Sequence, residues 1–320
     1  MKRGLVIGKF MPVHNGHLAL IGFAKSQCNE LIVSMSYTLT DPIDHNIRLG
    51  WLKQLLADDP TVKVEESLDD FDDESVPLFE RTKVWARFIQ KRFPKIDLVI
   101  SSESYGEPFA HHLGVPHVLF DLHRAQVPVS ATLVRAKPLT YWNYIPKIVQ
   151  PYFVKKVCLY GPESTGKSVM AKKLADLYQT EWVPEVAREI VSSNVFTVEE
   201  IVKIGNAHVA RMAEKEKIAN RFLFCDTDII TTQIYCNYYL NTVPPVLFEL
   251  EKQVRFDAYF LFDIDVPWVA DGMRDLSHLR KQMFETFKSE LERRPLPYTF
   301  VQGNWEQRLQ IVQQKLGMFN

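Results

Sequence analysis

Short apolar runs alternate with amphipathic stretches along the first half of the chain. In the amphipathic stretches, such as residues 18–24 and 46–58, apolar residues recur every three or four positions, as they do on one face of a helix. Strands that alternate with helices are typical of a parallel sheet covered by helices. We therefore expect strands at residues 5–7, 31–35, 98–101 and 117–120, with helices between them.

One acidic segment breaks this alternation. The residues EESLDDFDDESVP, 65–77, carry many carboxylates and show no apolar period. Runs of like charge are usually solvated, so we interpret the segment as a surface loop, with a lid over a substrate as the alternative.

A second strand-turn-helix pattern begins after residue 154. It follows YWNYIPKIVQPYF, residues 141–153, whose two prolines and irregular aromatics indicate a packed linker. Further apolar strands are expected within 155–161, 221–228, 258–265 and 298–301. A chain of 320 residues exceeds the usual size of a single core. We expect an α/β fold with domains at 1–150 and 151–320, each a parallel sheet flanked by helices.

Composition narrows the classes of partner. Lys and Arg number 38 against 39 Asp and Glu, which leaves no basic surplus for nucleic acid or an anionic membrane. No apolar run approaches the roughly 20 residues of a membrane span. The four cysteines form no C-x-x-C pair and are expected to be reduced thiols in a cytoplasmic protein. Small molecules are thus the expected partners, and self-association into a homo-oligomer is left open.

The strongest motif is GPESTGKS, residues 161–168, which matches G-x-x-x-x-G-K-[ST] between an apolar run and a helical stretch. In such a loop the glycines let successive N–H groups point at phosphate oxygens. The lysine reaches the β- and γ-phosphates and the final hydroxyl ligates Mg²⁺. ATP and Mg²⁺ are therefore the expected cofactors. The residues expected to bind them are Gly161, Glu163, Ser164, Thr165, Gly166, Lys167 and Ser168.

Phosphoryl transfer also needs an acid near the metal and a cation over the transferred group. Asp226 and Asp228 end an apolar run, and Asp226 is the candidate metal ligand; the alternative is that these acids cap a helix. Glu185 and Arg188 are candidates for a base and a ribose clamp at the acceptor, with a surface carboxylate as the alternative for Glu185. Arg274 is the candidate lid arginine, unless it simply begins a charged helix.

The stretch GKFMPVHNGH, residues 8–17, places His14 and His17 three residues apart where a strand turns into a helix. A metal site is not supported, because there is neither a cysteine cluster nor an H-E-x-x-H context. We interpret both histidines as facing a phosphate chain over the helix N-terminus. Gly8 would allow close approach of the ligand, and Lys9 would add a cation.

These motifs together resemble a known family. GKFMPVHNGH resembles the (H/T)-x-G-H signature of nucleotidylyltransferases, and VSATLVR, residues 129–135, resembles their S-[TSA]-x-x-[RK] motif. Their order, followed by a P-loop domain, resembles NadR-type proteins, in which nicotinamide-nucleotide adenylyltransferase is joined to ribosylnicotinamide kinase. Further similar stretches are SSESYGEPFAHHLGV, DTDIITTQ and WVADGMRDL. Some members begin with a helix-turn-helix repressor domain, whereas this chain starts at the first strand, so DNA binding is not expected.

The resemblance implies roles for particular residues of the first domain. His14 and His17 would contact the ATP triphosphate, with Gly8, Lys9 and Phe10 beside the nucleotide. The phosphates that leave as pyrophosphate would be held by Ser130, Thr132 and Arg135. The phosphate of nicotinamide mononucleotide would attack the α-phosphate in line, without a covalent intermediate.

Two weaker candidates concern the mononucleotide. Arg48 would clamp its phosphate and Trp85 would stack on its ring, although Trp85 also fits a half-buried helix position. In the second domain the resemblance implies transfer of the ATP γ-phosphate to the 5′-hydroxyl of nicotinamide riboside. The product of the second domain would then be the substrate of the first.

Two alternatives keep the same motifs. One is another small-molecule adenylyltransferase fused to a different P-loop kinase. The other is a nucleotide-binding sensor with an inert kinase half, against which the intact Gly161, Lys167, Ser168 and Asp226 argue. No motif reports whether the amide or the acid form of the pyridine ring is preferred.

Overall fold

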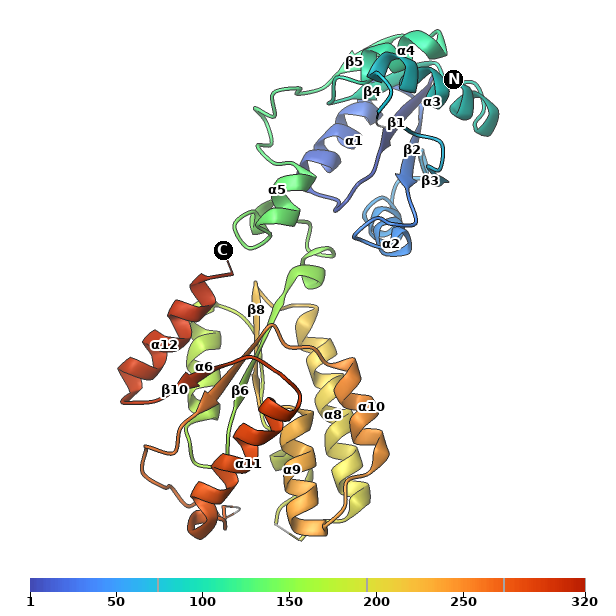
Figure 1. Ribbon diagram of the computed structural model, residues 1–320. Helices are drawn as coiled ribbons and strands as arrows, with labels where there is room; N and C mark the ends of the chain where they lie inside the picture. The colour runs from blue at the N-terminus through green and yellow to red at the C-terminus, as the bar shows by residue number, and fades with distance from the viewer. Residues whose placement is uncertain (74, 194, 273, 320) are drawn as a thin grey trace. The chain divides into compact units, whose positions relative to one another are not determined.

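The computed structural model describes residues 1–73, 75–193, 195–272 and 274–319. The chain forms two compact units, Met1–Val149 and Gln150–Asn320. Each unit contains one five-stranded sheet whose strands all run parallel, flanked by helices (Figure 1). The predicted α/β class, with two parallel sheets, is confirmed.

The first sheet has the strand order β3-β2-β1-β4-β5. The chain leaves β1 to build strands on one side and returns to build β4 and β5 on the other, so the order reverses beside β1. In sheets of this kind ligands bind at the carboxyl ends of the strands where the order reverses. The elements are β1 (Arg3–Gly8), α1 (Asn15–Gln27), β2 (Glu30–Tyr37), α2 (His45–Leu55), β3 (Val62–Leu68), α3 (Leu78–Arg92), β4 (Leu98–Ser101), α4 (Gly106–Leu113), β5 (His117–Leu119) and α5 (Ala131–Ala136).

The core of the first unit joins the central strands to α3 and α4. Leu5, Ile32 and Val99 come from three neighbouring strands and pack with Ile89 of α3 and Phe109 of α4. All five are at least nine-tenths buried. The apolar runs expected to be strands therefore form the centre of this core.

The interpretation of residues 65–77 as a loop was wrong for its first part. Residues 65–68 belong to β3, which pairs with β2 from Val62 to Leu68. Because β3 is the edge strand of the sheet, its acidic side chains can stay solvated while its backbone is paired. The absence of an apolar period was thus a property of an edge strand. Glu74, in the same segment, lies outside the described residues.

The linker region contains two short 3-10 helices, η1 (Trp142–Tyr144) and η2 (Gln150–Phe153). In the first unit, Trp142 and Ile145 are almost fully buried. The prolines at 146 and 151 prevent a long helix here, because proline lacks the N–H that a helix interior requires.

The second sheet has the order β10-β9-β6-β8-β7 and again reverses beside its first strand, β6. Helices α6 and α12 lie on one side of this sheet, and α8, α9 and α10 lie on the other (Figure 1). Within the described ranges, no helix combines the length and apolarity required to cross a bilayer. The elements are β6 (Lys155–Tyr160), α6 (Lys167–Tyr178), β7 (Trp182–Val183), α7 (Ala187–Ile190), α8 (Val198–Glu216), β8 (Phe222–Asp226), α9 (Ile229–Leu240), α10 (Pro245–Gln253), β9 (Ala258–Phe262), η3 (Ser277–Leu279), α11 (Arg280–Arg293), β10 (Tyr298–Val301) and α12 (Trp305–Gly317).

Candidate functional site

The two histidines of the first unit lie together at the start of α1. His14 is the N-cap residue, and its ring stacks on that of His17 with centroids 3.7 Å apart. The backbone N–H of His14 donates to His17 Nδ1 at 3.3 Å. Because Nδ1 accepts, the proton of neutral His17 is placed on Nε2, which leaves that N–H free to act as a donor.

Burial keeps both histidines neutral. Burial and, to a smaller extent, the nearby Arg124 guanidinium together lower the pKa of His14 to about 4. Burial, with His14 and Arg124, also holds the pKa of His17 well below its usual value. Nδ1 of His14 is buried and has no hydrogen-bond partner among the described residues. The pair can therefore offer hydrogen bonds to an anion at neutral pH without carrying a charge.

A hollow of about 610 Å³ opens over these histidines and is also lined by Ser130 and Thr132. Ser130 is the N-cap of α5, where its hydroxyl accepts from the N–H of Leu133 at 3.2 Å. The start of a second helix thus faces the same hollow, and helix starts favour anions. The structure brings the two sequence motifs together as expected.

Two further motif residues lie beside this hollow rather than in its wall. Arg135 donates to the carbonyl of Met11 and, at 3.4 Å, to the hydroxyl of Thr132. Phe10 is buried and its ring lies 4.9 Å from that of His17, so it supports the histidine.

Sequence reasoning missed three charged residues of this hollow, Glu103, Asp121 and Arg124. Arg124 donates to Glu103 at 2.6 Å, and Asp121 accepts from the N–H groups of residues 125 and 126 at 2.7 and 2.9 Å. These residues follow β4 and β5. β4 lies beside β1 and β5 lies beside β4, so both strands end at the edge where the strand order reverses, and this position was the signal that could have identified these residues.

A second hollow of the first unit, of about 770 Å³, contains Gly8, Lys9 and Trp85 in its wall. The Trp85 indole donates to Asp72 at 3.1 Å, and Arg81, which pairs with the same carboxylate, lies 5.5 Å from the ring centroid. These contacts hold the Trp85 indole at the wall of the hollow, with its N–H edge hydrogen-bonded to Asp72. Neither Asp72, in the acidic segment 65–77 that shows no apolar period, nor Arg81, on α3, was among the expected site residues.

Arg48 does not lie in either hollow, which contradicts its expected role as a phosphate clamp. Its side chain is fully buried, and it donates to the carbonyls of Lys9 and Ile43 and to Asp41 at 2.6 to 2.9 Å. An arginine whose donors are already used inside the protein cannot also clamp a substrate. Its role is to hold the segment after β1 against α2.

In the second unit the motif 161–168 forms a loop between β6 and α6. Gly161 and Gly166 have φ angles of 137° and 89°, which side chains disfavour. A Cβ at Gly166 would lie 2.8 Å from the Trp305 ring, so only glycine fits there. Lys167 is buried and donates to the carbonyl of Pro162 at 2.7 Å. A hollow of about 450 Å³ over this loop is also lined by Ser168 and Arg274.

Asp226 ends β8 directly beside β6 and is 1% exposed. Both of its carboxylate oxygens are buried without a hydrogen-bond partner in the described ranges. Burial raises its pKa to about 6, against the attraction of Lys167. An unpartnered carboxylate near a P-loop hydroxyl suits Mg²⁺, which uses one or two carboxylates and completes its ligands with phosphates and water. The residues present therefore fit the expected metal.

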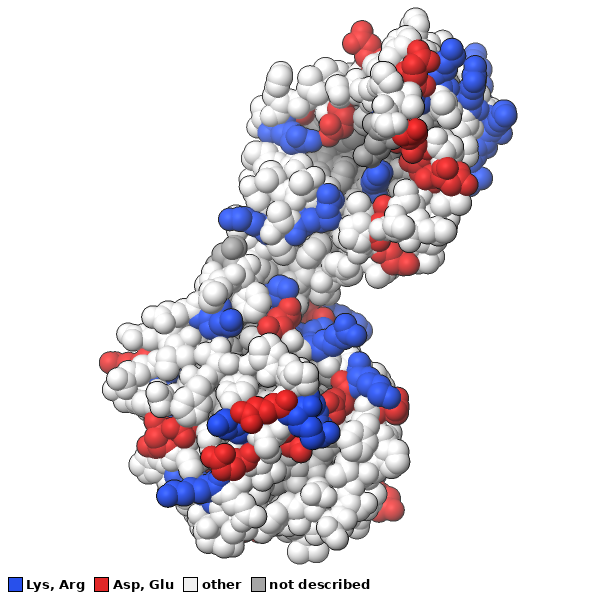
Figure 2. Space-filling model, viewed as in Figure 1, with Lys and Arg blue, Asp and Glu red and all other residues white. Residues whose placement is uncertain are grey.

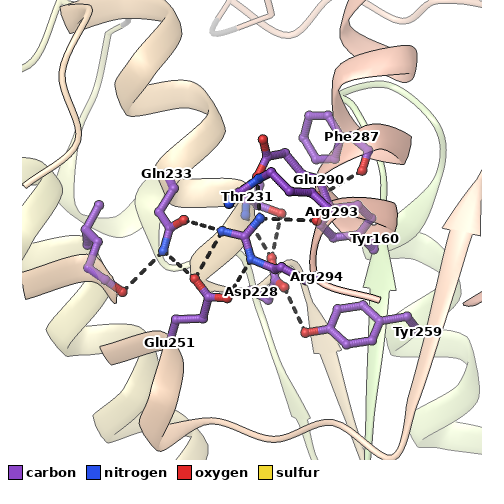
Figure 3. A network of polar contacts seen from close by, with 11 residues as sticks. Tyr160, Asp228, Thr231, Gln233, Glu251, Tyr259, Phe287, Glu290, Arg293 and Arg294 are labelled. Carbon is purple, nitrogen blue, oxygen red and sulfur yellow. Dashed lines mark hydrogen bonds and ion pairs between the residues drawn. The ribbon is translucent and has the colours of Figure 1, made fainter. Parts of the chain in front are cut away.

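Asp228 does not face the substrate, contrary to its assignment as a binding residue. It is 2% exposed and is the N-cap of α9, where it accepts from the N–H and hydroxyl of Thr231 at 2.8 and 2.9 Å. Tyr259 donates to its other oxygen at 3.1 Å. Figure 3 shows it in a polar network in which Arg294 bonds Glu251. The alternative, a helix-capping acid, is correct for Asp228.

The remaining charged candidates form a chain beside the loop. Arg188 donates to Glu185 at 2.6 Å and to Asp271 at 2.7 Å, and Arg274 pairs with the same Asp271 at 3.1 Å. Val269, in the segment that carries Arg274, donates its N–H to the hydroxyl of Ser164 at 2.7 Å. The expected lid segment thus lies against the phosphate-binding loop. Met273 of this segment is outside the described residues.

A second hollow of this unit, of about 800 Å³ including space open to solvent, adjoins the loop, and Glu163, Glu185 and Arg188 line both spaces. Burial and, to a smaller extent, the negative charge of Asp275 raise the pKa of Glu163 to about 7. Sequence reasoning missed the wall away from the loop, which comes from α8, from α9 and from the segment before α8. Its members are Phe196, Ile201, Ile204, His208 and Tyr239.

Charged side chains of both signs are mixed on the surface of the second unit. On the face shown in Figure 2, acidic and basic side chains are interspersed over the second unit, without a broad basic expanse. Among the described residues, no group of three or more His, Cys, Asp or Glu side chains is arranged to hold a metal. Any resident cation would therefore depend on ligand phosphates as well as on Asp226.

The chain is similar in sequence to several known proteins. Residues 156–308 match the family model of an AAA domain. The trifunctional NAD biosynthesis/regulator protein NadR of Escherichia coli is 32% identical, over 90% of this chain and 75% of its own length. A nicotinamide-nucleotide adenylyltransferase of Thermococcus onnurineus is 27% identical, over 49% of this chain and 83% of its own.

A solved structure also has this fold. The crystal structure of a NadR protein in complex with NR superimposes with a TM-score of 0.81 and covers 99% of this chain and 96% of its own, at 18% identity. A second NadR structure, in complex with NAD and AMP-PNP, gives a TM-score of 0.79.

Proposed function

The chain belongs to the NadR family and is a transferase of NAD biosynthesis, and from this premise we propose that it catalyses two consecutive reactions. In the first, the second unit phosphorylates nicotinamide riboside with ATP to nicotinamide mononucleotide. In the second, the first unit adenylylates this mononucleotide with ATP to NAD and pyrophosphate. The observation that carries the proposal is that each unit places a helix start for phosphates beside a separate hollow for an acceptor.

In the first unit, the ATP triphosphate lies over the start of α1. Neutral His14 and His17 donate hydrogen bonds to it, and the N-terminus of α5 with Ser130 and Thr132 faces the departing pyrophosphate. Hydrogen bonds aimed at oxygens that gain charge stabilise the transition state more than the ground state. Arg135 would reach the phosphates by exchanging its contact with the Met11 carbonyl.

The mononucleotide occupies the hollow that contains Lys9 and Trp85. The indole provides a flat face for the pyridine ring, and Lys9 attracts the phosphate that attacks ATP. Because the phosphate is itself the nucleophile, the protein needs only to align it with the α-phosphorus and to exclude water.

In the second unit, the N–H groups of residues 161–168 surround the ATP phosphates. Lys167 releases the carbonyl of Pro162 to contact the β- and γ-phosphates, while Ser168 and Asp226 would hold Mg²⁺. The metal would neutralise charge on the phosphate oxygens. Arg274 approaches from the segment against Ser164 and would contact the transferred group.

The riboside occupies the adjoining hollow with its 5′-hydroxyl toward the loop. Glu163 and Glu185 border both spaces, so either carboxylate can accept the hydroxyl proton. Arg188 fixes Glu185 through their 2.6 Å contact and supports it as a ribose clamp. The pKa of Glu163, raised to about 7, makes it the rival base.

Product analysis tests the proposal directly. The protein is incubated with nicotinamide riboside, ATP and Mg²⁺, and the mononucleotide, NAD, ADP and pyrophosphate are followed over time. We expect the mononucleotide with ADP first, then NAD with pyrophosphate. Accumulation of the mononucleotide without NAD would refute the role of the first unit. Absence of both products would refute the substrate assignment and favour another acceptor or a sensor.

Two variants test whether the sites are separate. Lys167→Ala should lower the kcat of phosphorylation by roughly 100-fold or more and spare adenylylation, and His17→Ala should do the reverse. Lys172→Ala, at an exposed position on the same helix α6, and His111→Ala, at an exposed position on α4, are the matched controls. Loss of both activities in one folded variant would contradict the assignment.

A further inference from the structure

His208 lies in the wall of the acceptor hollow of the second unit, on helix α8. It is 3% exposed, and its Nε2 is buried without a hydrogen-bond partner in the described part of the chain. Its neighbours on the same face of α8, Ile201 and Ile204, are apolar and belong to a core cluster. An imidazole in such surroundings costs stability, because an unpaired buried polar atom loses its bonds to water.

The walls of the hollow indicate which end of a substrate meets His208. Glu163, Glu185 and Tyr235 border both this hollow and the phosphate-binding loop, whereas His208 and Ile204 border only the hollow. A nucleoside that presents its 5′-hydroxyl to the loop therefore places its sugar near the shared residues. Its base is then at the far end, against α8.

The chemistry of the imidazole selects among bases. Burial lowers the pKa of His208 to about 4, so the ring is neutral at physiological pH. A neutral imidazole offers one N–H donor and one acceptor nitrogen. A carboxamide can pair with either, whereas a carboxylate would add a negative charge to an apolar wall in a hollow that already contains Glu163 and Glu185.

We propose that His208 determines the base specificity of the kinase unit by hydrogen-bonding the carboxamide of the pyridine ring, which favours the amide over the acid form of the riboside. The inference rests on the proposed kinase function and deepens it. His208 is distant from the transferred phosphate in this arrangement, so it contributes to substrate binding rather than to the chemical step.

The test compares His208→Leu and His208→Gln with wild type, using nicotinamide riboside and nicotinic acid riboside as substrates. Removing a buried hydrogen bond should raise the KM for nicotinamide riboside roughly 10- to 100-fold in His208→Leu, with kcat and the KM for ATP little changed. The preference for the amide substrate should fall in the same variant. Glutamine can place an amide near the position of Nε2, so His208→Gln should retain most of the affinity for nicotinamide riboside and most of the preference for the amide substrate.

Asn206→Leu is the matched control, because Asn206 is exposed on the same helix. Thermal melting verifies that each variant folds; if leucine is not tolerated, His208→Phe replaces it and keeps the ring without nitrogens. An unchanged KM and an unchanged substrate preference in a folded leucine or phenylalanine variant would overturn the inference about His208 and leave the proposed kinase function standing. Failure of the wild-type protein to phosphorylate nicotinamide riboside would refute the proposed function and the inference together.

Discussion

Arg308 of α12 supports the phosphate-binding loop from beneath, and its replacement by methionine is expected to damage one activity only. The side chain is fully buried and donates to the carbonyls of Thr165, Gly303 and Asp263 at 2.8 to 3.1 Å, as well as pairing with Asp265. Methionine has a similar length but no donor. The three carbonyls would then be left without this partner, one of them inside the loop.

The magnitude follows from these contacts. Removing one partner of a buried ion pair typically costs roughly 3 to 5 kcal/mol, because the remaining groups stay desolvated. Asp265 is partly exposed and can regain water, so the lower half of this range is expected. In a unit of this size, each kcal/mol lowers Tm by about 2 to 4 °C. Arg308→Met should therefore lower the Tm of the second unit by roughly 6 to 16 °C.

The assay measures two quantities on the whole chain. Thermal unfolding should show the lower Tm of the second unit in Arg308→Met. Steady-state kinetics below that temperature should show a higher KM for ATP in phosphorylation. Adenylylation, which uses the first unit, should be unchanged. Arg293→Met is the control, since the Arg293 side chain is 60% exposed and contacts Glu290 on the surface. A Tm within 2 °C of wild type, or equal losses in both activities, would refute this reasoning.

Three further predictions concern single residues. Burial raises the pKa of Asp226 from 3.8 to about 6, so the ionised carboxylate destabilises the fold above pH 6. Asp226→Asn should therefore raise the Tm measured at pH 8 in EDTA, and this gain in Tm should disappear as the pH falls toward 4. The same variant should lose phosphorylation activity. Asp228→Ala should instead lower stability by about 1 to 3 kcal/mol in denaturant titrations, since Thr231 and Tyr259 lose their acceptor. Trp85→Ala should raise the KM for nicotinamide mononucleotide about tenfold and leave phosphorylation unchanged in steady-state assays.

Much of the fold was readable because buried parallel strands are continuous apolar runs. Residues 5–7 and 31–35 lie within β1 and β2, and the strand before the P-loop is β6. The edge strand β3 was missed, since one of its faces is solvated and its charges hide the period. Edge strands depend on pairing with a neighbour, which a local pattern does not contain.

The two motifs expected to contact phosphates were recognisable for a different reason. Both motifs place their residues within one turn between a strand and a helix, so sequence spacing fixes their geometry. Arg48 and Asp228 were misassigned because a charged residue near a motif can face either the ligand or the protein, and only tertiary contacts decide. His208 gave no signal, since a single histidine on an amphipathic helix is compatible with an ordinary core position.

Burial favours the neutral form of His14 in the first unit and of Glu163 in the second, but the two groups titrate at different pH, so the two proposed reactions should have distinct pH profiles. The pKa of His14 is lowered to about 4 by burial, so its titration should not affect adenylylation between pH 6 and 9. Burial raises the pKa of Glu163 to about 7. If Glu163 accepts the proton of the substrate hydroxyl, its ionised carboxylate is the active form, and kcat/KM for phosphorylation should rise as the pH increases through about 7. Glu163→Gln should abolish this inflection, whereas persistence of the inflection would transfer the role of base to Glu185. Measuring both reactions in the same buffers makes each activity the control for the other, since a profile shared by both would indicate unfolding or titration of ATP rather than of either site.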